Sequence, residues 1–147
     1  MPISWEHVDF FKPEEFDDPD HPGSGEQISG ELLILLDRLR RETDWPIVTH
    51  AAVGGCVDVN GTHGHSENSY HLLKNGAKAV DFHFSTDKSP REQFYMVIHG
   101  GFTGIGVYYD WSWNNRKLPI GFHVDIRPKY SSQMWKRQDG KYLYLLA

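Results

Sequence analysis

Residues 78–84 read Lys-Ala-Val-Asp-Phe-His-Phe, and every second side chain from Val80 onward is large and apolar. Successive side chains of a β-strand point to opposite faces, so Val80, Phe82 and Phe84 would share one face. Asp81 and His83 would share the other. The segment is therefore predicted to be a strand with one face in a hydrophobic core and one polar face.

A second segment near the C-terminus has the same design. Residues 121–126 read Gly-Phe-His-Val-Asp-Ile, which places His123 and Asp125 on the face opposite three apolar side chains. If both strands belong to one sheet whose apolar faces pack on helices, their His and Asp side chains converge on the open side.

The rest of the chain supplies helices and further strands. A leucine stripe at helical spacing predicts a helix over residues 29–42, and the capping box of residues 89–92 predicts another that ends at Gly100-Gly101. Short strands are expected at residues 46–49 and 105–109, and a hairpin over 134–146 turns at Asp139-Gly140. Residues 10–25 and 50–70 are predicted to be loops. We expect one α+β domain over residues 1–147, with a small, mostly antiparallel sheet and helices on one face.

Composition excludes several classes of function. A net charge of −5 gives no basic surface for nucleic acid or an anionic membrane, and Cys56 is the single cysteine. The longest apolar run, residues 32–36, is too short to span a bilayer, and residues 1–7 do not resemble a signal peptide. The chain is thus expected to be made in the cytoplasm without a signal peptide, and to be a monomer.

His71, Asp81 and His123 form a candidate metal site. Two imidazoles and one carboxylate suit tetrahedral zinc and leave a fourth position for water, for which Asp125 is the best-placed proton shuttle. Such sets also hold Fe(II), but there a His-x-Asp pair normally comes first, with a further His downstream. His63 and His65 are further candidate metal ligands, but a flexible exposed loop is the favoured interpretation of this segment.

Three segments resemble the zinc D-alanyl-D-alanine carboxypeptidase family, which shares the hedgehog-type fold and includes phage L-alanyl-D-glutamate endopeptidases. They are residues 69–71 (Ser-Tyr-His), 76–81 (Gly-Ala-Lys-Ala-Val-Asp) and 121–125 (Gly-Phe-His-Val-Asp). The resemblance implies zinc held by His71, Asp81 and His123, and peptidoglycan stem peptides as substrates. It further implies that Ser69 supports the site by hydrogen bonding; Arg127, two residues past Asp125, is expected to meet a substrate carboxylate.

The chain departs from the family pattern at three points. His71 and Asp81 are ten positions apart, more than is usual in the family, so residues 72–75 must bulge. Ile120 and Gly121 stand where the family carries an acid or a histidine, which leaves proton transfer to Asp125, Asp110 or Glu67. The Arg-containing segment that precedes the family's Ala-Val-Gly-Gly stretch is missing here.

Two functions remain open at this stage. The first is a zinc peptidase of the bacterial cell wall, encoded by a phage or a bacterium, that hydrolyses an amide bond with zinc-activated water. The alternative is a binding or structural module, such as a phage particle component, that keeps the zinc but does not hydrolyse. Trp111 and Trp113 are either a buried lid anchor or a sugar-stacking surface.

Overall fold

The computed structural model describes residues 4–146, so the first three residues of the N-terminal segment considered above lie outside it. Two α-helices and two sheets form the described fold. The helices are α1 (Gly30–Thr43) and α2 (Pro90–Ile98). The strands are β1 (Ile47–Thr49), β2 (Ala79–Phe84), β3 (Gly104–Tyr108), β4 (Ser112–Trp113), β5 (Arg116–Lys117), β6 (Gly121–Asp125), β7 (Gln133–Gln138) and β8 (Lys141–Leu146).

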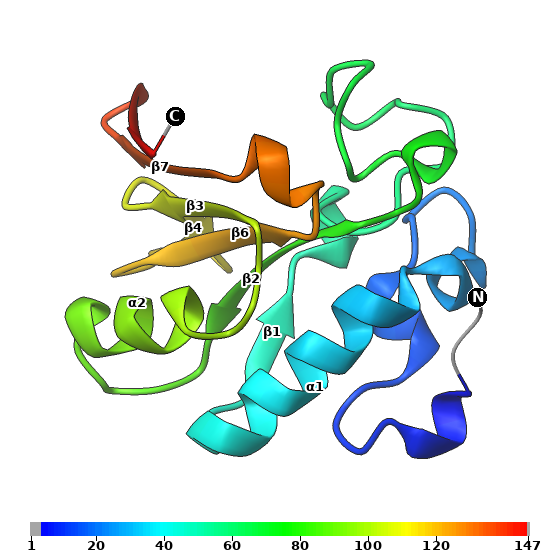
Figure 1. Ribbon diagram of the computed structural model, residues 1–147, viewed down its shortest axis with the longest axis horizontal. Coiled ribbons are helices and arrows are strands. Elements are labelled where there is room, and N and C mark those ends of the chain that lie inside the picture. The colour runs from blue at the N-terminus through cyan, green and yellow to red at the C-terminus, as the bar shows by residue number, and fades with distance from the viewer. Residues whose placement is uncertain (1–3, 147) are drawn as a thin grey trace.

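The main sheet has six strands in the order β1-β2-β6-β3-β7-β8 (Figure 1). All neighbours pair antiparallel except β3 and β7, which run parallel. The predicted α+β class with a mostly antiparallel sheet is therefore confirmed. β2 and β6, the two alternating segments, lie side by side near the middle of this sheet.

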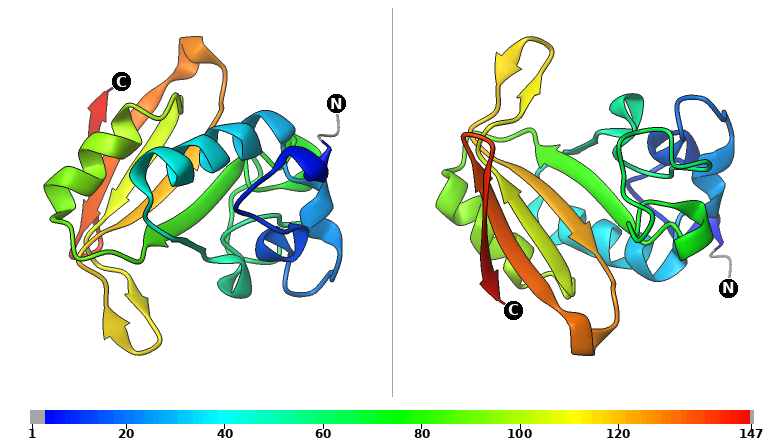
Figure 2. Two further views of the ribbon diagram at one scale, coloured as in Figure 1. Left: turned by 90° about the horizontal axis from the view of Figure 1, so that it is seen from below. Right: turned by 90° about the horizontal axis from the view of Figure 1, so that it is seen from above.

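Both helices cover the same face of the sheet, as the two views of Figure 2 show. The apolar stripe of α1 and Val97 of α2 pack against the apolar side chains of β2, β3 and β6. The predicted starts of the helices are confirmed, since Ser29 caps α1 and Ser89 with Glu92 forms a capping box at α2. The opposite face of the sheet is left for polar side chains and loops.

A small hairpin, β4–β5, was not predicted from the sequence. It projects from one end of the main sheet (Figure 2) and turns at Asn114 and Asn115, whose φ angles are 50° and 64°. Two consecutive residues in the left-handed region make the type I′ geometry that suits a two-residue hairpin, and asparagine tolerates it. The consecutive residues Asn114 and Asn115 were the feature of the sequence that could have predicted this turn.

The loops expected at residues 10–25 and 50–70 contain short 3₁₀ turns but no longer regular element. Buried carboxylates anchor them. Asp18 binds the backbone N–H of Val59 at 2.8 Å and the ring of His63 at 2.8 Å, which ties the two loops together. Within the described residues, no helix combines the length and apolar character needed to cross a membrane.

Candidate metal centre

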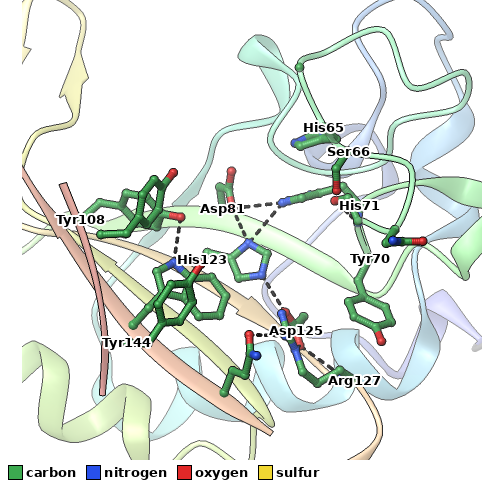
Figure 3. Close-up of a pocket in the computed structure, with 16 residues that line it drawn as sticks. His65, Ser66, Tyr70, His71, Asp81, Tyr108, His123, Asp125, Arg127 and Tyr144 are labelled. Atoms are coloured by element: carbon green, nitrogen blue, oxygen red, sulfur yellow. Dashed lines mark hydrogen bonds and ion pairs between the residues drawn. The ribbon is translucent and has the colours of Figure 1, made fainter. Parts of the chain in front are cut away.

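Asp81 and His123 lie directly opposite one another on the antiparallel strands β2 and β6. Their neighbours Val80, Phe82 and Val124 point into the core, so the two polar side chains project from the face that the helices do not cover. His71 reaches the same point from the end of the long loop, as Figure 3 shows.

Three potential ligand atoms of these residues converge. His71 Nε2 lies 3.2 Å from Asp81 Oδ1 and 3.2 Å from His123 Nδ1, and His123 Nδ1 lies 2.9 Å from Asp81 Oδ1. The side chains are 4%, 19% and 11% exposed for His71, Asp81 and His123. The structure thus brings together all three residues that the sequence nominated, and we call them the triad.

The remaining nitrogen of each triad imidazole is fixed by an acceptor. His71 Nδ1 lies 3.0 Å from the carbonyl oxygen of Cys56, and His123 Nε2 lies 2.7 Å from Asp125 Oδ2. A carbonyl and an ionised carboxylate only accept hydrogen bonds, so these nitrogens carry the ring protons. When both rings are neutral, the nitrogens that face Asp81 present lone pairs, so three potential ligand atoms meet at one point.

The electrostatics of the triad attract positive charge. Burial alone would raise the pKa of Asp81, but His71 and His123 outweigh it and hold that pKa far below its ordinary value. Burial likewise opposes a charge on His123, yet its hydrogen bonds to Asp125 and Asp81 prevail and raise its pKa to about 9. Binding of a proton or of a metal ion at the triad is therefore electrostatically favourable.

The spacing of the triad is compatible with a tetrahedral metal ion such as zinc. Bonds of about 2.0–2.1 Å in a tetrahedral site place ligand atoms roughly 3.3 Å apart, close to the 2.9–3.2 Å separations in the triad. Hard cations such as Ca²⁺ and Mg²⁺ prefer oxygen ligands, whereas two of the three donors here are nitrogens. The triad would hold the ion, and a fourth position would remain open toward the adjacent cavity.

His65 lies beside the triad, which the sequence did not indicate. It offers a ligand atom within 4.8 Å of those of His71 and Asp81. Its ring stacks on His71 with centroids 4.2 Å apart and an angle of 12° between the planes. An imidazole binds a metal in its own ring plane, so two stacked parallel rings cannot both bind one ion. His65 is therefore a neighbour of the site rather than a fourth ligand.

Asp125 and Arg127 form an ion pair with each other. Asp125 is fully buried behind His123, and Arg127 Nε and Nη2 donate to its two oxygens at 2.8 and 2.6 Å. Arg127 Nη1 donates to Gln133 at 3.0 Å. Burial would raise the pKa of Asp125, but Arg127 and His123 hold it far below its usual value. A carboxylate so engaged is a poor proton acceptor. Asp125 and Gln133 accept three of the five N–H groups of Arg127, so two donors remain for a substrate carboxylate.

Ser69 supports the segment that carries His71. Its hydroxyl accepts the backbone N–H of His71 at 3.2 Å, and its carbonyl accepts a hydrogen bond from Asn75 at 2.8 Å. The bulge expected between His71 and Asp81 is a 3₁₀ turn, Leu73–Asn75, that ends at Gly76 with a φ of 102°. This turn absorbs the extra residues without displacing either triad member.

Two acids considered for proton transfer lie elsewhere. Glu67 is 85% exposed and pairs with Lys74 at 3.4 Å. Asp110 accepts the backbone N–H of Gly140 at 2.9 Å and pairs with Arg137 at 3.1 Å. Neither lines the cavity at the triad, whereas His65 does.

The triad opens into a cavity of about 520 Å³, the main cavity, whose walls include Tyr70, Trp135 and Tyr144. Two glycines of β3 make room for it. A Cβ on Gly104 would overlap the carboxylate of Asp125, and one on Gly106 would lie 2.6 Å from the ring of Trp135. The alternate glycines were a sequence signal for a crowded strand face.

Asp58 organises the loop that carries His65. The buried carboxylate accepts backbone N–H groups of Gly61 and Thr62 at 2.9 and 3.2 Å, and lies 2.9 Å from His65 Nδ1. The loop is largely exposed, as predicted, but the side chain of His65 is held by this carboxylate and is only 17% exposed.

We expect Asp58→Asn to loosen this loop, because the amide nitrogen would face the N–H donors that the carboxylate now accepts. Amide hydrogen exchange over residues 59–68 should accelerate by about tenfold or more, as the loss of roughly 1–3 kcal/mol of local stability implies. Asp87→Asn, a change at an exposed position, serves as the control. Unchanged exchange in Asp58→Asn would show that other contacts hold the loop.

No protein-family model matches this chain, and neither does any curated protein or any solved structure. Three local features therefore bear on the function of the chain. They are the geometry of the triad, the acceptors that fix its imidazoles, and the cavity into which its open side faces.

Proposed function

We propose that this chain is a zinc-dependent peptidase that hydrolyses an amide bond in peptidoglycan stem peptides, with the hedgehog-type fold of the family it resembles. The observation that carries the proposal is the convergence of ligand atoms of His71, Asp81 and His123 within 3.2 Å of one another. Three protein ligands and an open position are typical of catalytic zinc, whereas structural zinc sites are closed by four.

In this proposal the role of each residue follows from its position in the site. Zinc, when bound, supplies Lewis acidity that activates water and polarises the amide carbonyl. Asp125 holds His123 in the tautomer that presents Nδ1, and Arg127 holds Asp125, which replaces the proton-shuttle role predicted for Asp125. His65, fixed through Nδ1 by Asp58, accepts the proton of the attacking water and returns it to the leaving amine.

His65→Gln tests this role. The glutamine cannot transfer a proton, so kcat is expected to fall by about 10²–10⁴-fold while zinc remains bound at one equivalent. His7→Gln, at an exposed histidine, should leave both quantities unchanged. Loss of zinc from the His65→Gln protein would instead make His65 a fourth ligand, and the closed site would favour the alternative function.

The function itself is tested by incubating the zinc-loaded protein with purified peptidoglycan and identifying released peptides by mass spectrometry. We expect new amine termini to appear, and chelation of the zinc to stop their release. The alternative, a zinc-stabilised binding or structural module, is favoured by one observation. Among the described residues, Asp81 and Asp125 are the acids that line the main cavity, and both are engaged. Tight zinc binding without release would support that alternative.

A further inference from the structure

The last strand of the main sheet, β8, is an edge strand (Figure 2, dark red). It pairs with β7 on one side, and no described strand pairs with it on the other. Four consecutive side chains of β8 are large and half exposed: Tyr142, Leu143, Tyr144 and Leu145 are 52%, 52%, 61% and 49% exposed. A long apolar edge of this kind is a surface on which another strand can pair.

The features that usually protect an edge strand from pairing are scarce in β8. Such features are proline, several charged side chains, a short strand or a β-bulge. Residues 141–146 contain no proline, and Lys141 at the first position is their one charged residue. The register with β7 shifts once, between Met134 and Trp135, which lie opposite Leu146 and Tyr144. Residues 141–144 are therefore the regular, unprotected part of the edge.

Tyr142 and Tyr144 direct their backbone N–H and C=O groups away from β7. The β7–β8 hairpin has a two-residue turn, so its closing pair, Gln138 and Lys141, is a hydrogen-bonded pair. Bonded and non-bonded pairs alternate along antiparallel strands, which places Tyr142 and Tyr144 in non-bonded pairs. Arg137, opposite Tyr142, accordingly directs its carbonyl to the residue that follows β3. The peptide groups of both tyrosines face the open edge.

This edge is complementary to a second copy of itself. In an antiparallel pair centred on Leu143, Tyr142 of each copy lies opposite Tyr144 of the other, and their outward peptide groups form four hydrogen bonds. Leu143 meets Leu143 of the other copy on the two-fold axis, in the closer, non-bonded kind of pair. Lys141 lies opposite Leu145, so like charges do not meet. An in-register parallel pair would instead place Lys141 beside Lys141.

We propose that two copies of this chain associate through β8 into a two-fold symmetric dimer, in which their six-stranded sheets join along this edge. The interface is isologous, since the same strand contributes from both sides. A single strand pair buries less surface than the roughly 1,600 Å² of a standard interface, so the dimer should dissociate on dilution. This association replaces the monomer that was expected from the sequence.

The dimer extends the wall of the main cavity. Tyr142 and Tyr144 both line that cavity, and side chains two positions apart on a strand share one face. In the joined sheet, Tyr142 of the second copy stands beside Tyr144 on this face. Each copy thus adds an aromatic ring next to the other's cavity. Association through β8 requires neither zinc nor hydrolysis, so its test is independent of the proposed peptidase function.

Sedimentation equilibrium of the full chain, with zinc and without it, tests the association. The weight-average mass should rise from that of one chain at about 5 µM toward that of two chains at about 500 µM, as expected for a dissociation constant of roughly 10–100 µM. A mass that stays at one chain throughout this range, or that grows beyond two chains, would overturn the proposal.

Leu143→Lys should raise the dissociation constant of the dimer by about tenfold or more, because two ammonium groups would face each other across the axis. Ile34→Lys, at a residue of α1 that is 54% exposed, is the matched control and should leave the constant unchanged. Equal weakening in both variants would indicate general association of exposed apolar side chains. Undiminished association of Leu143→Lys would exclude the β8 edge. Either result overturns the proposal.

Oxidative cross-linking reports the register. Leu143→Cys places the thiols of the two copies opposite each other on the axis, with Cα atoms about 4.5 Å apart, which a disulfide can span. Leu145→Cys lies opposite Lys141 rather than itself and is the control, while Cys56 is buried in both variants. A mild oxidant should link Leu143→Cys about tenfold faster or more. Equal rates for the two variants, or no linkage of Leu143→Cys, would contradict the two-fold pairing.

Discussion

Asp81→Ala is expected to abolish zinc binding and, with it, peptide hydrolysis. The substitution removes the one carboxylate of the triad and leaves His71 Nε2 and His123 Nδ1 facing each other across 3.2 Å without an anion between them. Two neutral imidazoles do not compensate the charge of a divalent ion as two imidazoles and a carboxylate do.

The same variant should lose the stability that zinc confers. Zinc present at 1,000 times its dissociation constant stabilises the folded state by about 4.1 kcal/mol, which corresponds to roughly 8–16 °C in melting temperature for a chain of this size. The measurement compares melting with and without zinc in the wild type, in Asp81→Ala and in the exposed control Asp87→Ala. A zinc-dependent rise that persists in Asp81→Ala would remove Asp81 from the set of ligands.

Asp125→Ala should act mainly on folding and on the geometry of His123. It leaves Arg127, whose side chain is 14% exposed, without its ionic partner, and such a loss costs about 3–5 kcal/mol at buried pairs. It also releases the Nε2–H of His123, and loss of an acceptor behind a metal-binding histidine typically weakens metal affinity by about 10–100-fold.

The double variant Asp125→Ala/Arg127→Leu separates the two effects. Removing the guanidinium as well takes away the unpaired buried charge, so part of the lost stability should return. Zinc affinity should stay low, because His123 still lacks its acceptor. Thermal melting and zinc titration measure both quantities. Normal stability and zinc affinity in Asp125→Ala, with activity abolished, would restore the proton-shuttle role.

The fold was largely predictable because its main elements carry strong periodic signals. The alternation in β2 and β6, the leucine stripe of α1 and the capping box of α2 each indicated the correct element. The parallel pairing of β3 with β7 was not predictable, since it joins segments far apart in the sequence and depends on which edge of the sheet the tail reaches.

The sequence predicted which residues lie together at the candidate site, but not the contacts that each of them makes. Alternation placed Asp81, His123 and Asp125 on one face. It could not show that Asp125 faces the far nitrogen of His123 and the fork of Arg127, because that depends on side-chain rotation. His65 was a candidate metal ligand, but its place beside the triad was not predictable because a loop position has no period. Asp58, a buried residue in the same loop, holds it there.

The central claim is that His71, Asp81 and His123 hold one zinc ion and leave a position open. X-ray absorption at the zinc edge, on protein loaded with zinc and dialysed, tests this most directly. One zinc per chain, bound by two imidazoles and otherwise by oxygen, is the predicted result. Failure to retain stoichiometric zinc, or coordination by a third imidazole, would contradict the claim.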